Sequence, residues 1–257
     1  MTGLSRLLAH PLTRGLHPDD PVTTAVRRQL IRGKPFLRRI YLEWYRKIAN
    51  ALPSVPGEVL ELGSGAGFLA EVCPGLITSE VFLCEGIRAV VDGRQLPFAD
   101  CSLRAIVMTD VLHHIPDVER FLGEARRTLK PGGRLVMVEP WVSGWSRFIY
   151  GRFHPEPFRP EASTWSFPPA GPLSGANGAI PWIVFKRDGP RFQALFPDLS
   201  VRRIEAFMPL RYVLSGGVSM RSLAPGWSFP LWAALERLAG PWMDHLAMFA
   251  FIEVHKG

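Results

Sequence analysis

The chain has 257 residues, of which 47% are hydrophobic and 21% are charged, values typical of a globular protein rather than a disordered one. This length suits one large domain, or a domain with a substantial addition. The net charge is +7, and all of the excess lies in residues 1–50, which hold ten Lys or Arg against three Asp or Glu. That excess indicates either attraction to an anionic surface, such as acidic lipid, or a solvated helix face.

The three cysteines are widely spaced and odd in number, which argues against a disulfide scaffold. The start of the chain contains no continuous apolar stretch, so we expect no secretory signal. Prolines or charges interrupt the two longest apolar segments, residues 162–185 and 229–252, which argues against transmembrane helices. We therefore expect a cytoplasmic protein, with peripheral contact to an anionic membrane through residues 1–50.

Two helices are predicted near the N-terminus. Asp20 followed by Pro21 is typical of a helix start, and this helix extends to Gly33. A second helix begins at Pro35. Apolar side chains recur every four residues along it, at Phe36, Ile40, Trp44 and Ile48. This stripe indicates a face packed against the rest of the protein.

From residue 58 the pattern changes to short apolar strands that alternate with helices, which favours a parallel sheet in a doubly wound α/β fold. We expect strands at residues 59–62, 76–82, 89–91, 105–109 and 134–138. We expect helices at 68–72 and 116–129, and a turn at 130–133. Near the C-terminus, strands at 199–212 and 248–254 flank a helix at 232–238.

After Pro140 the chain becomes irregular, and residues 153–182 are rich in Pro, Gly, Ser and aromatic residues. Long segments without a regular pattern are usually functional or disordered, and the aromatic residues argue against disorder. We interpret this segment as a lid or substrate insert. Its tryptophans favour a sizeable hydrophobic or lipid-linked ligand, although they equally suit the core of the C-terminal half.

The sequence VLELGSGAG, residues 59–67, places a glycine-rich loop directly after a predicted strand. Glycines allow a tight turn and let backbone N–H groups approach a ligand. Glu80 ends the second predicted strand, where a carboxylate can accept hydrogen bonds from both hydroxyls of a ribose, and Glu85 is the alternative. Asp92 ends the third strand, where a carboxylate can accept from an adenine amino group. Ligands of open α/β sheets bind beyond these strand ends.

Residues 58–139 resemble the class I S-adenosylmethionine-dependent methyltransferases, in particular the small-molecule branch that includes the quinone-biosynthesis enzymes (type 11 methyltransferase domain). The resemblance rests on four motifs in order: ELGSGAG, VVDGRQLPF, VLHHIPD and LKPGGRLVMVEP. It implies a doubly wound, seven-stranded, Rossmann-like α/β sheet, with N-terminal helices and a substrate-side insert after the fifth strand. It also implies S-adenosyl-L-methionine as the cofactor. One departure is Arg104, where the family often has aspartate.

The resemblance also implies a role for each matching residue. The glycine loop surrounds the methionine part of the cofactor, Glu61 anchors that loop, and Asp110 begins the segment that passes the methionine end. Glu80 binds the ribose, and the loop that contains Asp92 binds the adenine. The implied cofactor-binding residues are Glu61, Gly63, Ser64, Gly65, Gly67, Glu80, Asp92, Gly93, Leu96 and Asp110.

Methyl transfer from a sulfonium is an in-line substitution, so the protein mainly aligns the acceptor. An oxygen or carbon acceptor can also need a base. The catalytic candidates are His113, His154 and Glu139, with His114 beside the first of them, because histidine titrates near neutral pH. A hydrogen-bonded structural role is the alternative for the adjacent histidines. No carboxylate–histidine group has a clear metal-ligand spacing, so we expect no metal.

We divide the chain into four parts: a basic N-terminal helical extension (1–52), an S-adenosylmethionine-binding α/β core (53–140), a lid or substrate insert (141–198), and a C-terminal part that completes the sheet (199–257). The predicted function is methyl transfer to an O or C atom of a hydrophobic small-molecule or lipid-linked acceptor. The alternatives are a catalytically inactive, cofactor-binding assembly protein and a nucleic-acid methyltransferase. Neutrality beyond residue 50 disfavours nucleic acid. The oligomeric state is left open.

Overall fold

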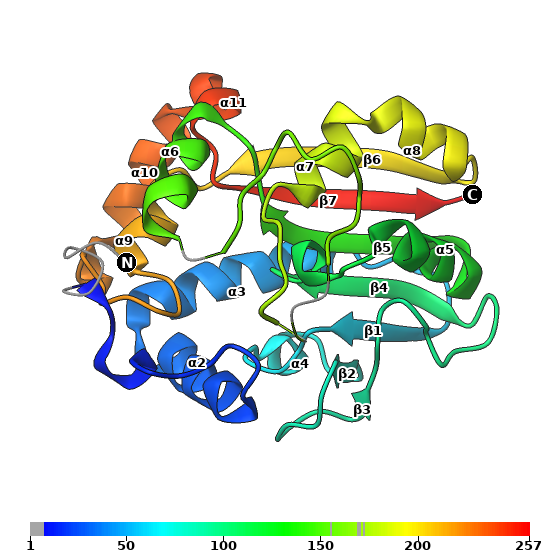
Figure 1. Cartoon of the computed structure of the whole chain (residues 1–257), viewed down its shortest axis with the longest axis horizontal. Helices are drawn as coiled ribbons and strands as arrows, with labels where there is room; N and C mark the ends of the chain where they lie inside the picture. Colours follow the sequence, from blue (N-terminus) through cyan, green and yellow to red (C-terminus); the bar gives the residue numbers. More distant parts are fainter. Residues whose placement is uncertain (1–7, 155, 169–170, 172) are drawn as a thin grey trace.

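The structure is a computed structural model that describes residues 8–154, 156–168, 171 and 173–257. Its centre is a seven-stranded sheet with helices on both faces (Figure 1). The strand order is β3-β2-β1-β4-β5-β7-β6, and β7 is antiparallel to both of its neighbours. The strands are β1 (Glu58–Leu62), β2 (Ile77–Glu80), β3 (Ala89–Val90), β4 (Leu103–Thr109), β5 (Leu129–Pro140), β6 (Leu199–Phe207) and β7 (Phe249–Lys256). The predicted doubly wound, seven-stranded α/β sheet is confirmed.

Both helices predicted near the N-terminus are present, as α2 (Pro21–Gly33) and α3 (Pro35–Asn50). The Asp20 side chain caps α2 by accepting the N–H of Val22 at 2.9 Å. All four residues of the apolar stripe on α3 are buried. The stripe packs against the sheet, as predicted, and each such side chain stabilises the fold by about 1.5–3 kcal/mol.

The side chains of each central strand alternate between two cores. On β4, Ile106 and Met108 face one side with α5 (Val118–Thr128), α7 (Ile180–Trp182) and α8 (Gly189–Leu195). Ala105 and Val107 face the other side with α3, α4 (Leu69–Val72) and α10 (Phe229–Leu238). The period of two follows from strand geometry, and it makes the fold a three-layer sandwich.

Three expectations about local structure are wrong. The chain after Pro140 is not irregular at once, because α6 (Gly144–Phe153) begins at a capping box between Ser143 and Ser146. The predicted turn at 130–133 lies within β5, where the pairing with β4 shifts register. The predicted strand at 199–212 stops at Phe207, because Met208 takes a left-handed φ of +59° and α9 (Arg211–Ser215) follows.

The remaining elements are short. They are η1 (Pro11–Thr13), η2 (Leu112–His114), η3 (Ile183–Arg187), η4 (Gly226–Ser228), η5 (Gly240–Trp242) and α11 (Met243–Leu246). Between α6 and α7 the described residues form bends and turns, which matches the irregular sequence pattern there, and the role of this segment as a lid or substrate insert stays a prediction. Part of that insert, residues 155, 169–170 and 172, and the first seven residues of the chain lie outside the described residues. Within the described ranges, no helix is both long and apolar enough to cross a membrane.

Candidate functional site

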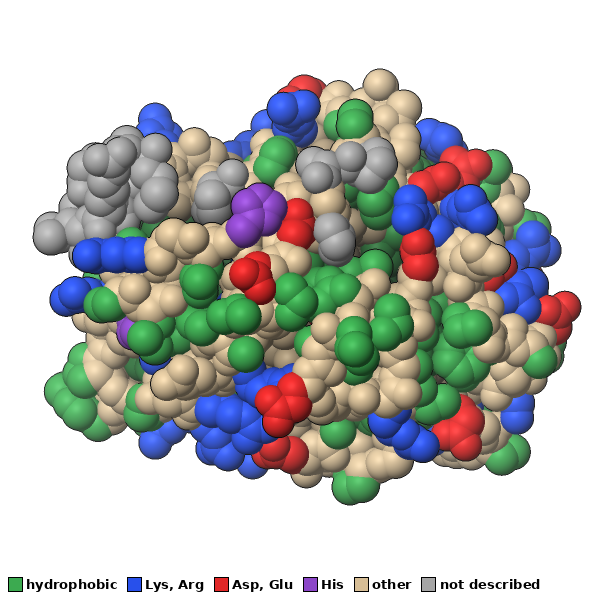
Figure 2. Space-filling model, turned by 60° about the horizontal axis from the view of Figure 1, so that its bottom comes forward, with side chains coloured by type: hydrophobic (Ala, Val, Ile, Leu, Met, Phe, Trp, Pro, Cys, Tyr) green, Lys and Arg blue, Asp and Glu red, His purple; other side chains and the backbone are tan. Residues whose placement is uncertain are grey.

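Three adjoining hollows lie at the carboxyl ends of β1, β2 and β4. We call them the Asp92 pocket, the Glu61 pocket and the His113 pocket, after one lining residue of each. Gly63 and Glu80 line both of the first two, and Asp110 and Glu156 line both of the last two. The three hollows therefore form one continuous row. Figure 2 shows hydrophobic side chains in a broad band across this side of the molecule, with a group of Lys and Arg below it.

The glycine loop is folded tightly between β1 and α4. Gly63 has a φ of +70°, and a Cβ there would lie 2.3 Å from Cγ2 of Val111, so no other residue fits. Ser64 ties the loop to β2, since its N–H donates to the Ser79 carbonyl at 2.8 Å. Its hydroxyl oxygen accepts the Ser79 N–H at 3.0 Å. Ser64 thus positions the loop and lines none of the three pockets.

Glu80 lies at the end of β2, and its side chain contacts the glycine loop. Its carboxylate accepts the N–H of Val81 at 2.9 Å and that of Gly65 at 3.3 Å. A Cβ on Gly65 would lie 2.7 Å from the carboxylate, so glycine is needed for this approach. Burial raises the pKa of Glu80 above its usual value. Glu85, the alternative, is exposed and lines none of the three pockets.

Glu61 is the second buried carboxylate of this region, and only 4% of its surface is exposed. It lines the Glu61 pocket, where burial raises its pKa to about 7. Its neighbour Glu80 adds a repulsion in the same direction. Burying two carboxylates next to an open pocket carries a desolvation cost. They are the kind of groups that a ligand with hydroxyl or ammonium donors would satisfy.

The N-terminal helices contribute residues that sequence reasoning did not assign. Thr24 and Arg27 of α2 line the Glu61 pocket. The Arg28 guanidinium donates through Nε to the Gly65 carbonyl at 3.0 Å. The charge excess of residues 1–50 was the available signal, but it does not indicate which arginine contacts the loop. Other basic residues there also bind protein groups, since Lys34 Nζ donates to the Gly217 and Met220 carbonyls at 2.6 and 2.9 Å.

The Asp92 pocket contains four of the predicted cofactor-binding residues, Gly63, Glu80, Asp92 and Gly93, whereas Leu96 lies elsewhere. Asp92 and Gly93 line the pocket next to Glu80. The Asp92 carboxylate is paired with Arg94 Nη2 at 2.7 Å, and these hydrogen bonds lower its pKa. Leu96 is buried in the core and does not line the pocket. Its backbone N–H donates to Glu124 Oε2 at 2.7 Å.

Asp110 lies where β4 ends and the Glu61 and His113 pockets meet. It has a φ of +63°, which is rare for a residue with a side chain and costs about 1 kcal/mol or more. Its N–H donates to the Val138 carbonyl at 2.8 Å, which fixes this turn. Burial raises the pKa of Asp110 to about 6, although 31% of its side chain still faces the hollow. The strained backbone thus aims a carboxyl group into the junction.

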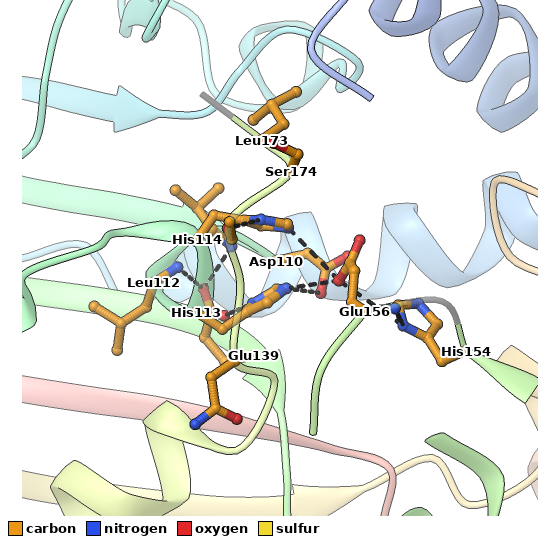
Figure 3. Close-up of polar contacts among 12 residues, drawn as sticks. Asp110, Leu112, His113, His114, Glu139, His154, Glu156, Leu173 and Ser174 are labelled. Atoms are coloured by element: carbon orange, nitrogen blue, oxygen red, sulfur yellow. Dashed lines mark hydrogen bonds and ion pairs between the residues drawn. The ribbon is translucent and has the colours of Figure 1, made fainter. Parts of the chain in front are cut away.

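Glu139 positions the loop after β4. It is fully buried, and its Oε1 accepts the N–H groups of Val111 and Leu112, both at 2.8 Å. Its Oε2 lies 2.8 Å from Nδ1 of His113, so this nitrogen donates to the carboxylate (Figure 3). Glu139 lines none of the three pockets. Of the three predicted catalytic residues, it is the one that the fold keeps away from the cavity.

His113 and His154, the other two candidates, both line the His113 pocket. Burial opposes the charged form of His113, but its contacts with Glu139 and Glu156 raise its pKa well above the usual value. Burial lowers the pKa of His154. The adjacent His114 lines the Glu61 and Asp92 pockets, and burial together with His113 lowers its pKa to about 4.

Glu156 brings the three histidines together. Its Oε2 lies 3.5 Å from Nε2 of His113, 3.8 Å from Nε2 of His114 and 3.8 Å from Nδ1 of His154. The side chains come from the loop after β4 and from the insert, and they converge on one point (Figure 3). These imidazoles hold the pKa of Glu156 well below its usual range, although burial alone would raise it. Sequence reasoning did not single out Glu156.

Residues 60–137 match a family model described as a methyltransferase domain. Over 109 residues the chain is 36% identical to the demethylmenaquinone methyltransferase of Corynebacterium glutamicum, covering 37% of this chain and 47% of that protein. It is 30% identical over 119 residues to the enzyme of the same name from Thermus thermophilus, covering 38% of this chain and 54% of that protein. The chain thus spans about half the length of the curated relatives that it matches.

Two solved structures are similar to the whole fold. A geranyl diphosphate methyltransferase in complex with geranyl diphosphate and sinefungin has a TM-score of 0.52 at 18% identity, covering 86% of this chain and 80% of that one. The geranyl diphosphate C-methyltransferase of Streptomyces coelicolor has a TM-score of 0.51 at 15% identity, covering 97% and 89%. The Rossmann-like methyltransferase fold is therefore shared, and the resemblance seen in the sequence is confirmed.

Proposed function

Because residues 60–137 carry a methyltransferase domain, we propose that this chain transfers the methyl group of S-adenosyl-L-methionine to an oxygen or carbon atom of a hydrophobic small molecule. One observation carries the proposal furthest. The buried Glu80 carboxylate lies against the Gly65 N–H at the wall of two adjoining pockets, with no room for a side chain at Gly65. Glu80 can thus accept hydrogen bonds from a ribose while the loop stays open to the methionine part.

The remaining residues fit the same ligand. Glu61 would face the amino group of the methionine part, where a positive charge relieves the cost of its burial. Asp92 and Gly93 would meet the adenine in the Asp92 pocket. Leu96 fits less well, since it lies in the core rather than at the pocket wall. The cofactor would therefore lie along the Asp92 and Glu61 pockets, with its reactive end towards Asp110.

The cofactor supplies an electrophilic methyl group, and the chain supplies the alignment of the acceptor. The His113 pocket begins at Asp110 and is lined by aromatic residues, among them Tyr150, Phe158, Tyr212 and Phe249. Its polar end holds His113, His154 and Glu156. An acceptor with an apolar body and one hydroxyl or activated carbon fits this division. His154, whose pKa burial lowers, is the group that would receive the proton that such an acceptor loses, whereas Glu139 and Glu156 hold His113 in its protonated form.

Calorimetric titration of the purified chain with S-adenosylmethionine and S-adenosylhomocysteine tests the proposal. We expect both to bind, and we expect labelled methyl groups to appear in quinone-precursor or prenyl-lipid extracts incubated with the protein. Failure of both ligands to bind would overturn the proposal. Binding without turnover on any extract would instead favour a cofactor-binding assembly protein. Salt-sensitive RNA or DNA binding with methylation would favour a nucleic-acid substrate.

We also propose peripheral contact with an anionic membrane, which would present a lipid-linked acceptor. Large apolar side chains are exposed along α10 and its flanking turns. They are Trp227, Leu231, Leu235, Leu238 and Trp242, with exposed fractions of 41–79%. Arg39 borders this face, because its guanidinium donates to the Gly226 carbonyl at 3.1 Å. Tryptophan and leucine next to arginine are typical of surfaces that insert into the headgroup region.

Co-sedimentation with vesicles containing phosphatidylserine tests this contact. We expect the wild type to sediment with anionic vesicles and much less with neutral ones. A variant with Trp227→Ser and Leu238→Ser should lose sedimentation while keeping cofactor binding. Charge reversal at Arg38 and Arg39 separates the basic contribution, which was one of two interpretations of the charge excess, from the apolar one. Unchanged sedimentation in both variants would exclude this surface.

A further inference from the structure

We propose that His113, His114 and Glu156 form a binding site for a divalent transition-metal ion at the junction of the Glu61 and His113 pockets. One potential ligand atom from each of these residues lies within 4.8 Å of the other two. The cluster joins η2 to the insert, about forty residues apart in the sequence. This site is independent of the proposed function, because no contact used in the argument involves the cofactor.

The tautomers of both histidines are set by partners on the far side of each ring. The Nδ1 atom of His113 donates to the Glu139 carboxylate at 2.8 Å. The Nδ1 atom of His114 lies 3.2 Å from the Gly175 carbonyl, which can only accept. His114 therefore presents an Nε2 lone pair to the Glu156 carboxylate, whereas His113, whose pKa is raised, carries a proton on Nε2 that a binding metal ion would release. A carboxylate or carbonyl behind an imidazole is the usual support of a metal-binding histidine.

The spacing around Glu156 suits a cation better than direct hydrogen bonds. The Nε2 atoms of His113 and His114 lie 3.5 and 3.8 Å from Oε2, beyond the roughly 2.7–3.2 Å of a good N–H···O bond. A metal about 2.0–2.1 Å from each ligand separates neighbouring ligands by roughly 3.0–3.4 Å. Small movements of the Glu156 side chain, which is 23% exposed, would close the difference.

The donor set indicates the class of metal. Two imidazole nitrogens and one carboxylate oxygen favour Zn²⁺, Co²⁺, Fe²⁺ or Ni²⁺ over Mg²⁺ and Ca²⁺, which prefer oxygen ligands. Two further groups border the site: Asp110 Oδ1 lies 4.0 Å from Nε2 of His113, and His154 Nδ1 lies 3.8 Å from Glu156 Oε2. The open side faces the aromatic His113 pocket. A bound ion would therefore keep a coordination position open towards that pocket.

Titration of the full chain with Co²⁺ after removal of metals by EDTA tests the site. Co²⁺ coordinated by histidine and carboxylate groups gives visible absorption bands. Zn²⁺ should displace the Co²⁺ and abolish these bands, whereas Mg²⁺ should not. We expect one saturable site in the wild type. Glu156→Gln and, separately, His114→Gln should weaken Co²⁺ binding by roughly 10- to 100-fold or more. Glu161→Gln, at an exposed carboxylate of the same insert, is the matched control and should bind as the wild type does.

The same samples are titrated with S-adenosylmethionine, and their circular dichroism is recorded. Loss of Co²⁺ bands in both site variants, with helix content retained, supports the metal site whether or not the cofactor binds. Equal Co²⁺ affinity in the wild type and both folded variants overturns it, as does a wild type that shows no bands and no Zn²⁺ binding. Absent cofactor binding with intact Co²⁺ binding would refute the proposed function alone.

Discussion

The Glu61 pocket and the His113 pocket share a wall at Asp110, yet they differ in how much of each is formed by one local motif. The acidic part of the first is local, because Glu61, Gly63, Gly67 and Glu80 lie within twenty positions of one another, although α2, α3 and later segments complete its walls. The second is formed by residues from η2, the end of β5, α6, the insert, α9 and β7. A local motif can therefore indicate the acidic part of the first pocket, whereas no local motif indicates the second.

The two pockets also differ in their electrostatics. The Glu61 pocket holds two buried acids whose charged forms are disfavoured by burial. Around the His113 pocket, acids and imidazoles face one another and stabilise each other's charges. The first pocket is therefore suited to a ligand that donates hydrogen bonds to its acids. In the second, the charges of the acids are balanced by imidazoles, or by a cation in the proposed metal site. The following four experiments probe this contrast.

The largest expected effect is at Gly65. In Gly65→Val the new side chain would occupy the space of the Glu80 carboxylate, 2.7 Å from its Cβ position, and push that carboxylate out of the pocket. We expect S-adenosylmethionine affinity to fall by about 100-fold or more, measured by calorimetry. Gly123→Ala in α5, where no atom lies within 4 Å, is the control and should leave binding unchanged. Similar losses in both variants would mean that the effect is global.

The second test separates Glu80 from Glu85. Glu80→Gln keeps the size of the side chain but removes its charge, and we expect cofactor affinity to fall by roughly 10- to 100-fold, because charge-assisted hydrogen bonds to the ribose are lost. Glu85→Gln alters an exposed side chain that lines no pocket and should have no effect. The reverse order of affinities would show that the ribose is held by Glu85.

The third test concerns the cost of burying Glu61. Its pKa is raised from 4.5 to about 7, so between these pH values the unfolded chain loses the proton while the folded chain keeps it. Stability therefore falls as the pH rises through this window and changes no further above it. Glu61→Gln should remove this fall. The difference in unfolding free energy between this variant and the wild type should therefore be larger at pH 8 than at pH 4, by on the order of 2–3 kcal/mol in favour of the variant. Urea unfolding at both pH values measures the difference, and a pH-independent difference would contradict it.

The smallest effect is expected on the acceptor side, at Asn177. Its side-chain oxygen accepts the N–H groups of Arg159 and Ala179 at 2.8 and 3.1 Å, and its own N–H donates to the His113 carbonyl at 2.9 Å. Asn177→Ala should cost about 1–2 kcal/mol of stability and loosen the insert. We expect acceptor KM to rise while cofactor affinity stays constant. Weakened cofactor binding instead would show that the two pockets are not separable.

The sequence predicted the fold and the cofactor side because both depend on local patterns. Alternating strands and helices indicate a parallel sheet, and the glycine loop is tied to the strand before it. The stripe on α3 was predicted to pack, and it does. The predicted boundaries of helices and strands were wrong where a single residue starts or ends the element, as at the Ser143 cap and at Met208. Neither residue changes the hydrophobic period on which the prediction relied.

The site was predictable to the same extent. Gly63 and Gly67 of the loop, Glu80, Asp92 and Asp110 line the row of pockets, and their roles there remain predictions. Ser64 and Gly65 do not line it. Leu96 does not line it but is buried in the core. The sequence could not indicate this, because a leucine next to a turn is compatible with a ligand-facing position and with a core position. Glu139 was chosen for its place at a strand end, but the strand's period of two points its side chain into the loop, where three hydrogen bonds hold it.

Sequence alone determined the sheet, the glycine loop and the acids that follow the strands, since each rests on residues within a few positions of one another. Only the tertiary structure decided that Arg28 contacts the loop, that Glu80 rather than Glu85 faces it, and that Glu156 gathers three histidines. Such contacts join segments separated by tens of residues. Their geometry follows from how the layers pack, which no local spacing in the sequence encodes.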